Sequence, residues 1–239
     1  MTAAVDQLTI KIFADGADVR GMLEMYRKPW IRGFTTNPTL MRKAGVADYR
    51  AFAHEVLVAI PDRPISFEVF SDDFVEMERQ ANEIASWGDN VYVKIPVTNT
   101  QGEHAYRLVG RLSQAGIKVN VTAIFTLEQV RAVVDQLDPA TAAYVSVFAG
   151  RIADTGVDPV PHMVAALEIT KRAPKAELIW ASPRELLNIF QADAIGCHVI
   201  TVTNDLLAKL AHVGKDLGEF SLETVKMFHD DAAKAGYKL

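Results

Sequence analysis

The sequence predicts an α/β protein that folds as a single (β/α)8 barrel, a TIM barrel, with an additional C-terminal helix. Short apolar runs alternate with longer segments of helical periodicity, a pattern typical of parallel α/β proteins. Eight strand-like runs follow one another, and no linker or low-complexity segment separates them. The length of 239 residues fits one such barrel, since these domains commonly have about 250 residues. We therefore expect one domain over residues 1–239.

The expected strands are rich in β-branched and aromatic residues and are bounded by residues that favour turns. In chain order they span residues 10–15, 33–36, 65–70, 91–96, 118–123, 143–148, 177–182 and 197–202. Cys197, the single cysteine, begins the last run. Because it has no partner for an internal disulfide, we expect it to be a core residue.

Helices are expected between the strands where capping residues precede a helical pattern. One begins behind Ser71 and Asp72, has an acidic first turn, runs to Trp87 and ends at Gly88. Others are expected over residues 49–59, 102–114, 127–137 and 159–172, and a terminal helix over about 221–236. The terminal helix could cover one mouth of the barrel or dock on a neighbouring subunit.

The main alternative fold is an open, doubly wound sheet that binds a nucleotide. That fold usually carries a glycine-rich turn after its first strand. Here the turn is DGAD, residues 15–18, which is neither GxGxxG nor a P-loop. The sequence therefore favours the closed barrel.

The charge balance gives no reason to expect a nucleic acid or a membrane as partner. The chain has 30 acidic and 25 basic residues, a formal charge of −5. Its longest stretch without Asp, Glu, Lys or Arg, residues 139–150, is well short of a membrane span. No basic segment leads into an apolar one at the N-terminus, so we expect a cytoplasmic protein. The six histidines show no metal-binding spacing, and no metal is expected.

Polar residues at the carboxyl ends of the strands are the candidates for a site, because the active sites of such barrels form there. Seven of the eight strands contribute: Asp15, Thr36 with Asn37, Glu68, Lys94, Asn120 with Thr122, Ser146, and Ser182 with Arg184. In the run VYVKIP, Lys94 shares a face with Tyr92, opposite three aliphatic residues. The polar face is expected to line the barrel.

Lys94 is the candidate nucleophile. Burial disfavours an ammonium, and a neutral amine in a pocket can form a Schiff base with a carbonyl substrate. Glu68, Asp15 and Thr122 would supply the proton transfers and position water. Each also has a structural interpretation: a lysine paired with Glu68, a turn residue at Asp15 and a β-former at Thr122. Their joint placement around one lysine favours imine chemistry.

Two arginines stand just beyond predicted strand ends, Arg151 after the sixth strand and Arg184 after the seventh. Two guanidiniums with the Ser182 hydroxyl could hold a phosphate. Surface arginines in ion pairs are the alternative interpretation.

Two segments resemble those of the transaldolase family. GFTTNPTLM, residues 33–41, resembles the family signature, and YVKIPVTNTQG, residues 92–102, resembles its Schiff-base lysine motif. FADGAD, FEVF, NVTAIFT, YVSVFAGRIAD and ASPR match further family blocks in the same order. The resemblance extends over residues 13–204 or so.

The resemblance implies a class I, cofactor-free enzyme of carbohydrate metabolism, as in the pentose phosphate pathway, that transfers a dihydroxyacetone unit from a ketose phosphate to an aldose phosphate. Lys94 would attack the donor ketone, Glu68 with Thr122 and a water would handle the protons of imine formation, and Asp15 would take the proton from the hydroxyl beside the breaking bond. The implied substrate-binding residues are Thr36, Asn37, Asn120, Ser146, Phe148, Arg151, Ser182 and Arg184. Short members of the family are often ring-shaped multimers, so a homo-oligomer is expected.

Two positions bear on the subgroup. Glu68 and Phe148 resemble transaldolase, whereas the related fructose-6-phosphate aldolases carry Gln and Tyr there. Glu103 and Pro183 depart from the usual family pattern and leave a sulfonated or other unusual sugar open. The alternatives are an aldolase that releases free dihydroxyacetone and a sugar-phosphate binding protein without turnover.

Overall fold

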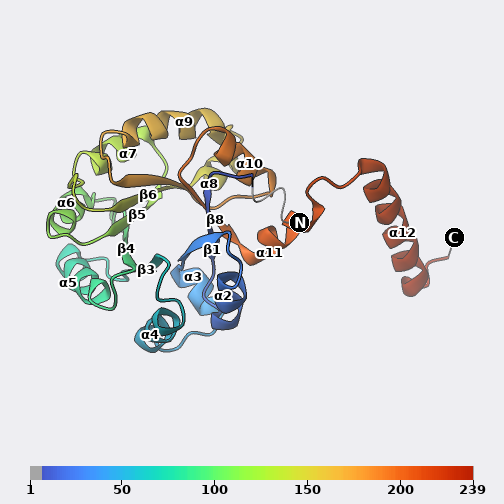
Figure 1. The fold of residues 1–239 in the computed structure, drawn as a ribbon, viewed down its shortest axis with the longest axis horizontal. Helices are drawn as coiled ribbons and strands as arrows, with labels where there is room; N and C mark the ends of the chain where they lie inside the picture. Colours follow the sequence, from blue (N-terminus) through green and yellow to red (C-terminus); the bar gives the residue numbers. More distant parts are fainter. Residues whose placement is uncertain (1–6, 239) are drawn as a thin grey trace.

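The computed structural model describes residues 7–238 and contains a closed barrel of parallel strands in the order β1 to β8 (Figure 1). The strands are β1 (Lys11–Asp15), β2 (Ile31–Thr35), β3 (Ile65–Glu68), β4 (Val91–Pro96), β5 (Val119–Ile124), β6 (Ala143–Val147), β7 (Ala176–Trp180) and β8 (Val199–Thr203). Each pairs with its sequence neighbours, and β8 pairs with β1. The predicted fold class is confirmed. The expected domain also includes residues 1–6 and 239, which lie outside the described part.

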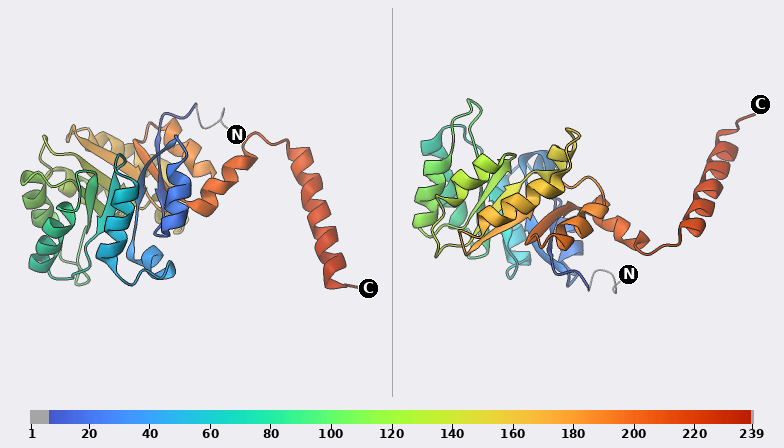
Figure 2. Two further views of the ribbon diagram at one scale, coloured as in Figure 1. Left: turned by 60° about the horizontal axis from the view of Figure 1, so that its bottom comes forward. Right: turned by 90° about the horizontal axis from the view of Figure 1, so that it is seen from above.

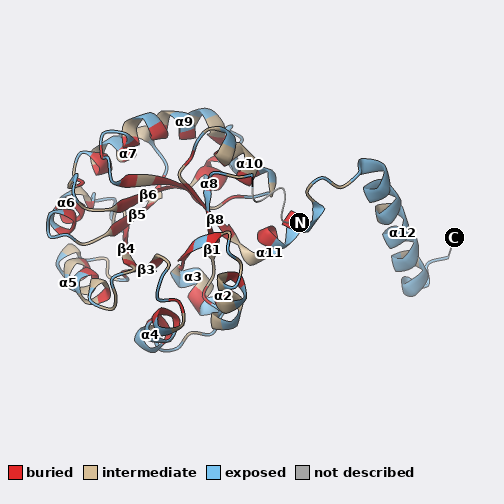
Figure 3. Ribbon diagram, in the orientation of Figure 1, coloured by how far each residue is buried: buried red, intermediate tan, exposed pale blue. Residues whose placement is uncertain are grey.

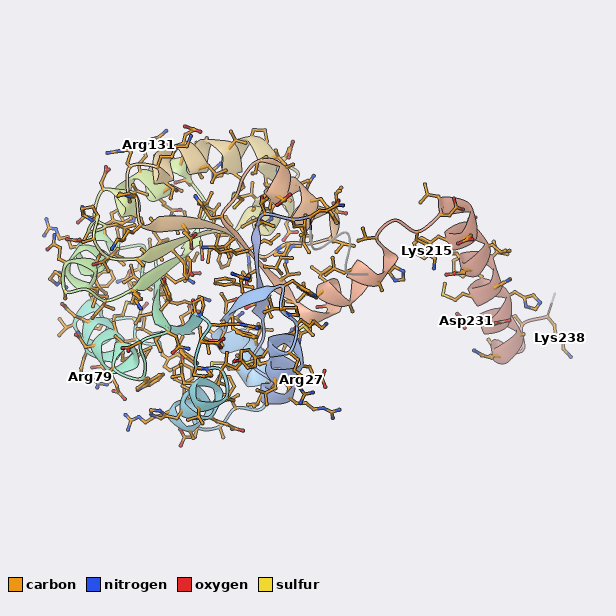
Figure 4. The ribbon with its side chains drawn as sticks, in the orientation of Figure 1. Arg27, Arg79, Arg131, Lys215, Asp231 and Lys238 are labelled. Atoms are coloured by element: carbon orange, nitrogen blue, oxygen red, sulfur yellow. The ribbon has the colours of Figure 1, made fainter. Side chains whose placement is uncertain are left out.

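Helices connect or follow the strands, and most of them lie around the barrel (Figure 1). They are α2 (Val19–Tyr26), α3 (Pro38–Lys43), α4 (Tyr49–Ala59), α5 (Phe74–Ala85), α6 (Tyr106–Gln114), α7 (Leu127–Val134), α8 (Ala149–Ala153), α9 (Pro159–Thr170), α10 (Leu187–Ala194), α11 (Asn204–Ala208), the 3-10 helix η1 (Lys209–His212) and α12 (Leu217–Ala235). Figure 3 shows buried residues on the sides of the ring helices that face the strands. Arg79 and Arg131 project outward from the ring (Figure 4).

Several predicted boundaries were wrong by a few residues. Helix α5 starts behind Asp73, whose carboxylate accepts from the backbone N–H of Glu76 at 2.9 Å, whereas Asp72 accepts from Thr100. Helix α6 starts at Tyr106 instead of residue 102, because Gly102 has a φ of 81° and belongs to a loop. Strand β3 ends two residues early at Glu68.

Two apolar layers hold the barrel. Val93 and Ile95 of β4 face the helices and belong to the larger core. Tyr92, on the opposite face, stacks on Tyr144 with ring centroids 4.2 Å apart, and Phe13 meets Tyr144 edge-on. These rings fill the half of the barrel at the amino ends of the strands. The other half is therefore left for polar side chains.

Gly33 and Cys197 both serve this packing. A Cβ on Gly33 would lie 2.6 Å from the Phe13 ring, so β2 needs glycine here. Cys197 is buried as expected, and burial raises the pKa of its thiol to about 12. A thiol in this environment stays protonated at neutral pH and acts as a small apolar residue.

Helix α12 stands away from the barrel and covers neither mouth (Figure 1, Figure 2). It begins at Leu217, earlier than predicted, because the Asp216 carboxylate accepts from the Glu219 N–H at 3.0 Å. It ends as predicted at Gly236, which has a φ of 67°. None of its residues is buried. Nowhere within residues 7–238 is a helix long and apolar enough to cross a membrane.

Candidate active site

A cavity of about 650 Å³ opens at the carboxyl ends of the strands. Nine of the predicted site residues line it: Asp15, Asn37, Glu68, Lys94, Thr122, Phe148, Arg151, Ser182 and Arg184. These residues come from β1 to β7 or the segments that follow them. The structure thus brings most of the predicted set into one hollow.

Lys94 lies at the floor of this cavity and is 6% exposed. Its Nζ donates to the carbonyl oxygen of Thr36 at 2.7 Å and lies 3.2 Å from Oε2 of Glu68. In the barrel register Lys94 stands beside Glu68 of β3 on one side and Asn120 of β5 on the other. The amine is therefore held by the Thr36 carbonyl, just after β2, and by the Glu68 carboxylate of β3.

Asp15 ends β1 and belongs to a second polar group. Its Oδ1 accepts from Thr35 Oγ1 at 2.7 Å, and the Thr35 hydroxyl also contacts the Thr201 hydroxyl. Burial raises the pKa of the Asp15 carboxyl, and the nearby charge of Lys94 and the Thr35 hydrogen bond oppose the rise. A carboxylate in this setting is a stronger base than an exposed one.

Three predicted substrate-binding residues lie behind the cavity wall. Ser146 Oγ donates to Asn120 Oδ1 at 2.7 Å, and Asn120 Nδ2 donates to Ser66 Oγ at 3.0 Å. Thr36 Oγ1 donates to the Ser66 carbonyl at 2.9 Å. Asn120, Ser146 and Thr36 are all buried. In this structure they form the polar support next to Lys94.

The outer part of the cavity carries the two arginines. The guanidinium of Arg151 lies 5.8 Å from the centre of the Phe148 ring, and in the described part of the chain no carboxylate comes within 4.0 Å of it. Arg184 instead pairs with Asp154 through Nε at 2.9 Å and through Nη2. This pair lowers the pKa of the Asp154 carboxyl. The ion-pair interpretation of Arg184 is thus realised, although the side chain still lines the cavity.

Ser182 lines the same cavity and has a left-handed conformation, with a φ of 60°. Its carbonyl oxygen would be 1.6 Å from a Cβ on Gly150, the second residue of α8. The loop after β7 and the start of α8 therefore approach closely because residue 150 is glycine. This contact brings Ser182 and Arg184 to the same rim as Arg151.

Several residues of the cavity were missed from the sequence: Thr35, Thr201, Thr203, Asp205 and Lys209. Thr201 and Thr203 show that the eighth strand does contribute, and their period of two within β8 was a usable signal. Lys209 comes from η1, for which the sequence offered no periodic pattern. Residues 7–238 include no group of three His, Cys, Asp or Glu side chains suited to a metal ion.

Comparison with known proteins gives a consistent result. The profile of the transaldolase/fructose-6-phosphate aldolase family matches residues 12–239. A probable transaldolase of Thermoanaerobacter sp. is 35% identical over 232 residues, which cover 96% of this chain and 100% of that protein. Probable transaldolases of Dehalococcoides mccartyi and Streptococcus equi subsp. zooepidemicus are 33% and 37% identical, each over 84% of this chain and 90% of the relative.

Solved structures also match the barrel. The crystal structure of dihydrodipicolinate synthase from Rhodopseudomonas palustris superposes with a TM-score of 0.57. It covers 81% of this chain and 70% of that chain at 12% identity, a level that shows the fold alone.

Proposed function

Because this chain belongs to the transaldolase/fructose-6-phosphate aldolase family, an enzyme family, we propose that it is a transaldolase, a transferase that moves a dihydroxyacetone unit from a ketose phosphate to an aldose phosphate through an imine on Lys94. The observation that carries the proposal is the buried Nζ of Lys94 at the floor of the cavity, 3.2 Å from Glu68 and hydrogen-bonded to the Thr36 carbonyl. An amine held at this position would meet the carbonyl carbon of a ketose that enters through the open end of the cavity.

Lys94 and Glu68 would carry imine formation. The amine adds to the ketone carbon and gives a carbinolamine, and loss of its hydroxyl as water gives the iminium ion. Glu68 is close enough to Nζ to accept one proton from the ammonium and free the amine. A second Nζ proton passes to the ketone oxygen as the carbinolamine forms, and Glu68 returns the first proton to that hydroxyl, which leaves as water. Thr122, which also lines the cavity, offers a hydroxyl to orient the water.

Asp15 would carry the cleavage. Removing the proton from the hydroxyl on the carbon next to the breaking bond releases an aldose, and the bonding electrons pass to the iminium, which becomes an enamine. The raised pKa of Asp15 supports the role of base. Attack of the enamine on an acceptor aldehyde and hydrolysis of the new imine complete the transfer and regenerate Lys94.

The phosphate of the sugar would lie at the outer rim with Arg151, Ser182 and Arg184. Asn37 would hold a donor hydroxyl, although its Oδ1 also caps α3 by accepting from the Leu40 N–H at 3.0 Å. Asn120 and Ser146 would act by supporting this arrangement from behind the cavity wall. Phe148 lines the cavity without a hydroxyl. The absence of an acid at this position favours transfer over release.

Borohydride trapping tests the proposal. With fructose 6-phosphate present, reduction is expected to fix the imine as a stable adduct on the peptide that contains Lys94, detected by mass spectrometry. Lys94→Ala should give no adduct and no turnover. An unmodified wild-type protein, or a fully active Lys94→Ala, would reject the mechanism. A panel of C3 to C7 sugar phosphates and one sulfonated ketose identifies the substrates.

We further propose that the enzyme is a homo-oligomer and that α12 docks on a second copy. Leu217, Val225 and Phe228 lie on one side of the helix and are 81%, 60% and 63% exposed. A stripe of this kind is expected to be covered by protein. Analytical ultracentrifugation should find a multimer for the wild type and smaller species for Phe228→Lys. Asp230→Lys, on the opposite side of α12, is the control and should keep the multimer.

A further inference from the structure

Strand β3 loses its β2 neighbour just before Glu68. The N–H of Phe34 donates to the Pro64 carbonyl at 2.8 Å, and the N–H of Thr36 donates to the Ser66 carbonyl at 3.2 Å. One more step of this parallel ladder would bond the Glu68 N–H to the Thr36 carbonyl and the Glu68 carbonyl to the N–H of residue 38. Residue 38 is proline, which has no N–H, and it starts α3. The ladder therefore ends, and both main-chain groups of Glu68 need other partners.

The hydroxyl of Tyr49 supplies both partners. It accepts from the Glu68 N–H at 2.8 Å and donates to the Glu68 carbonyl at 3.0 Å. Burial raises the pKa of this hydroxyl, so it stays protonated and can do both at once. The Tyr49 hydroxyl thus replaces the two backbone hydrogen bonds that β2 would otherwise make with Glu68.

Tyr49 is itself firmly placed. It is the first residue of α4, behind Asp48, whose carboxylate accepts from the Ala51 N–H at 2.9 Å. Its ring meets Phe70 edge-on with centroids 4.4 Å apart and Trp87 at 5.6 Å. The hydroxyl therefore has little freedom to move relative to β3.

The two bonds have a consequence at the nucleophile. Because the Glu68 N–H is satisfied by Tyr49, the Thr36 carbonyl is left to accept from Lys94 Nζ at 2.7 Å. The Glu68 main chain is fixed at the point where its carboxylate lies 3.2 Å from the same amine. We propose that Tyr49 is a positioning residue for imine formation, which holds Glu68 in register and keeps the Thr36 carbonyl available to Lys94. This role rests on the proposed function.

Tyr49→Phe tests the role in the full chain, because it removes the hydroxyl and keeps the ring. Tyr26→Phe is the matched control, since it removes a hydroxyl that donates to Asp62 at 2.7 Å and does not line the cavity. In Tyr49→Phe we expect kcat and the rate of borohydride trapping to fall about tenfold or more, with KM within about twofold. Tyr26→Phe should keep all three within about twofold of the wild type.

Amide hydrogen exchange supplies a second measurement. The Glu68 N–H should exchange faster in Tyr49→Phe, while thermal melting shows that the variant remains folded. Trapping at the wild-type rate, or a loss explained by the unfolded fraction, would overturn the role of Tyr49 and leave the proposed function standing. If the wild type traps no imine, the proposed function and this role both fail.

Discussion

Arg184 and Asp154 form a two-point ion pair at the rim of the cavity, with Nε 2.9 Å from Oδ1 and a second bond through Nη2. Arg151, on the same rim, has no carboxylate within ion-pair distance among the described residues. The two predicted phosphate ligands thus differ in net local charge. Of the two arginines, only Arg151 presents a guanidinium without a paired carboxylate to a phosphate that approaches this rim.

We expect Arg151→Gln to weaken phosphate recognition more than Arg184→Gln does. The KM for a phosphorylated ketose should rise about 10- to 100-fold for Arg151→Gln, since a charge-assisted contact is lost. The rise should be only about 3- to 10-fold for Arg184→Gln, because the charge of Arg184 is already offset by Asp154. Steady-state kinetics with matched phosphorylated and unphosphorylated donors measures this difference. Equal effects on both donors would show that these side chains do not hold the phosphate.

Asp15 is expected to lower stability in return for activity. Burial raises its pKa above the ordinary value of 3.8, so the unfolded chain binds the proton less tightly than the folded one. The loss of folding stability caused by Asp15 is therefore absent at pH values below the pKa of its carboxyl in the unfolded chain. It is complete at pH values above the raised pKa of that carboxyl in the folded protein. Asp15→Asn should therefore gain in free energy of unfolding, relative to the wild type, as the pH rises from 4 towards 7, and lose about 10²–10⁴-fold in kcat.

Urea titrations at several pH values measure the stability part. Asp154→Asn is the control of opposite sign, because Arg184 lowers the pKa of Asp154 and its carboxylate favours the folded state at neutral pH. A variant Asp15→Asn that loses stability as the pH rises would contradict the raised pKa of Asp15.

Gly150 is expected to tolerate no side chain. A Cβ there would lie 1.6 Å from the Ser182 carbonyl oxygen, so Gly150→Ala must displace the loop after β7. We expect a loss of about 1–3 kcal/mol or more in the free energy of unfolding and a raised KM for phosphorylated donors. Gly16→Ala, where a Cβ meets nothing within 4 Å, should stay within about 1 kcal/mol. Comparable losses in both variants would argue against the close approach.

Phe148→Tyr tests the proposed preference for transfer over release. A hydroxyl on this ring could protonate the enamine before an acceptor arrives, so release of free dihydroxyacetone should rise about tenfold relative to transfer. Phe125→Tyr is the control, since the centroid of the Phe125 ring lies 5.8 Å from that of Phe148 but Phe125 does not line the cavity. An unchanged ratio of release to transfer in Phe148→Tyr would refute this role.

The sequence predicted those elements whose pattern is local. Strand β4 and helix α4 have the predicted bounds, because alternation in VYVKIP and the Asp48 cap need no distant partner. The end of β3 was not predicted, since it depends on Pro38 and on Gln80, whose Oε1 accepts from the Phe70 N–H at 2.8 Å.

The prediction of the site from the sequence was limited in a similar way. Alternation indicated correctly that Asn120 shares the face of Lys94, but it does not give depth along the barrel axis, which depends on the stagger of the strands. Asn120 and Ser146 therefore lie behind the wall instead of lining it. The pairing of Arg184 with Asp154 joins two segments 30 positions apart and leaves no periodic trace in the sequence.

The close approach of α8 to the loop after β7 shows that the rim of the cavity and the Lys94 amine are held by different parts of the fold. Lys94 and Glu68 belong to neighbouring strands and share their ladder, whereas Ser182 and Arg184 belong to a connecting segment that rests on Gly150. Exchanging residues 182–184 together with Gly150 is expected to change the proposed anion site at the rim without moving Lys94. New donor specificities are therefore best sought at these positions.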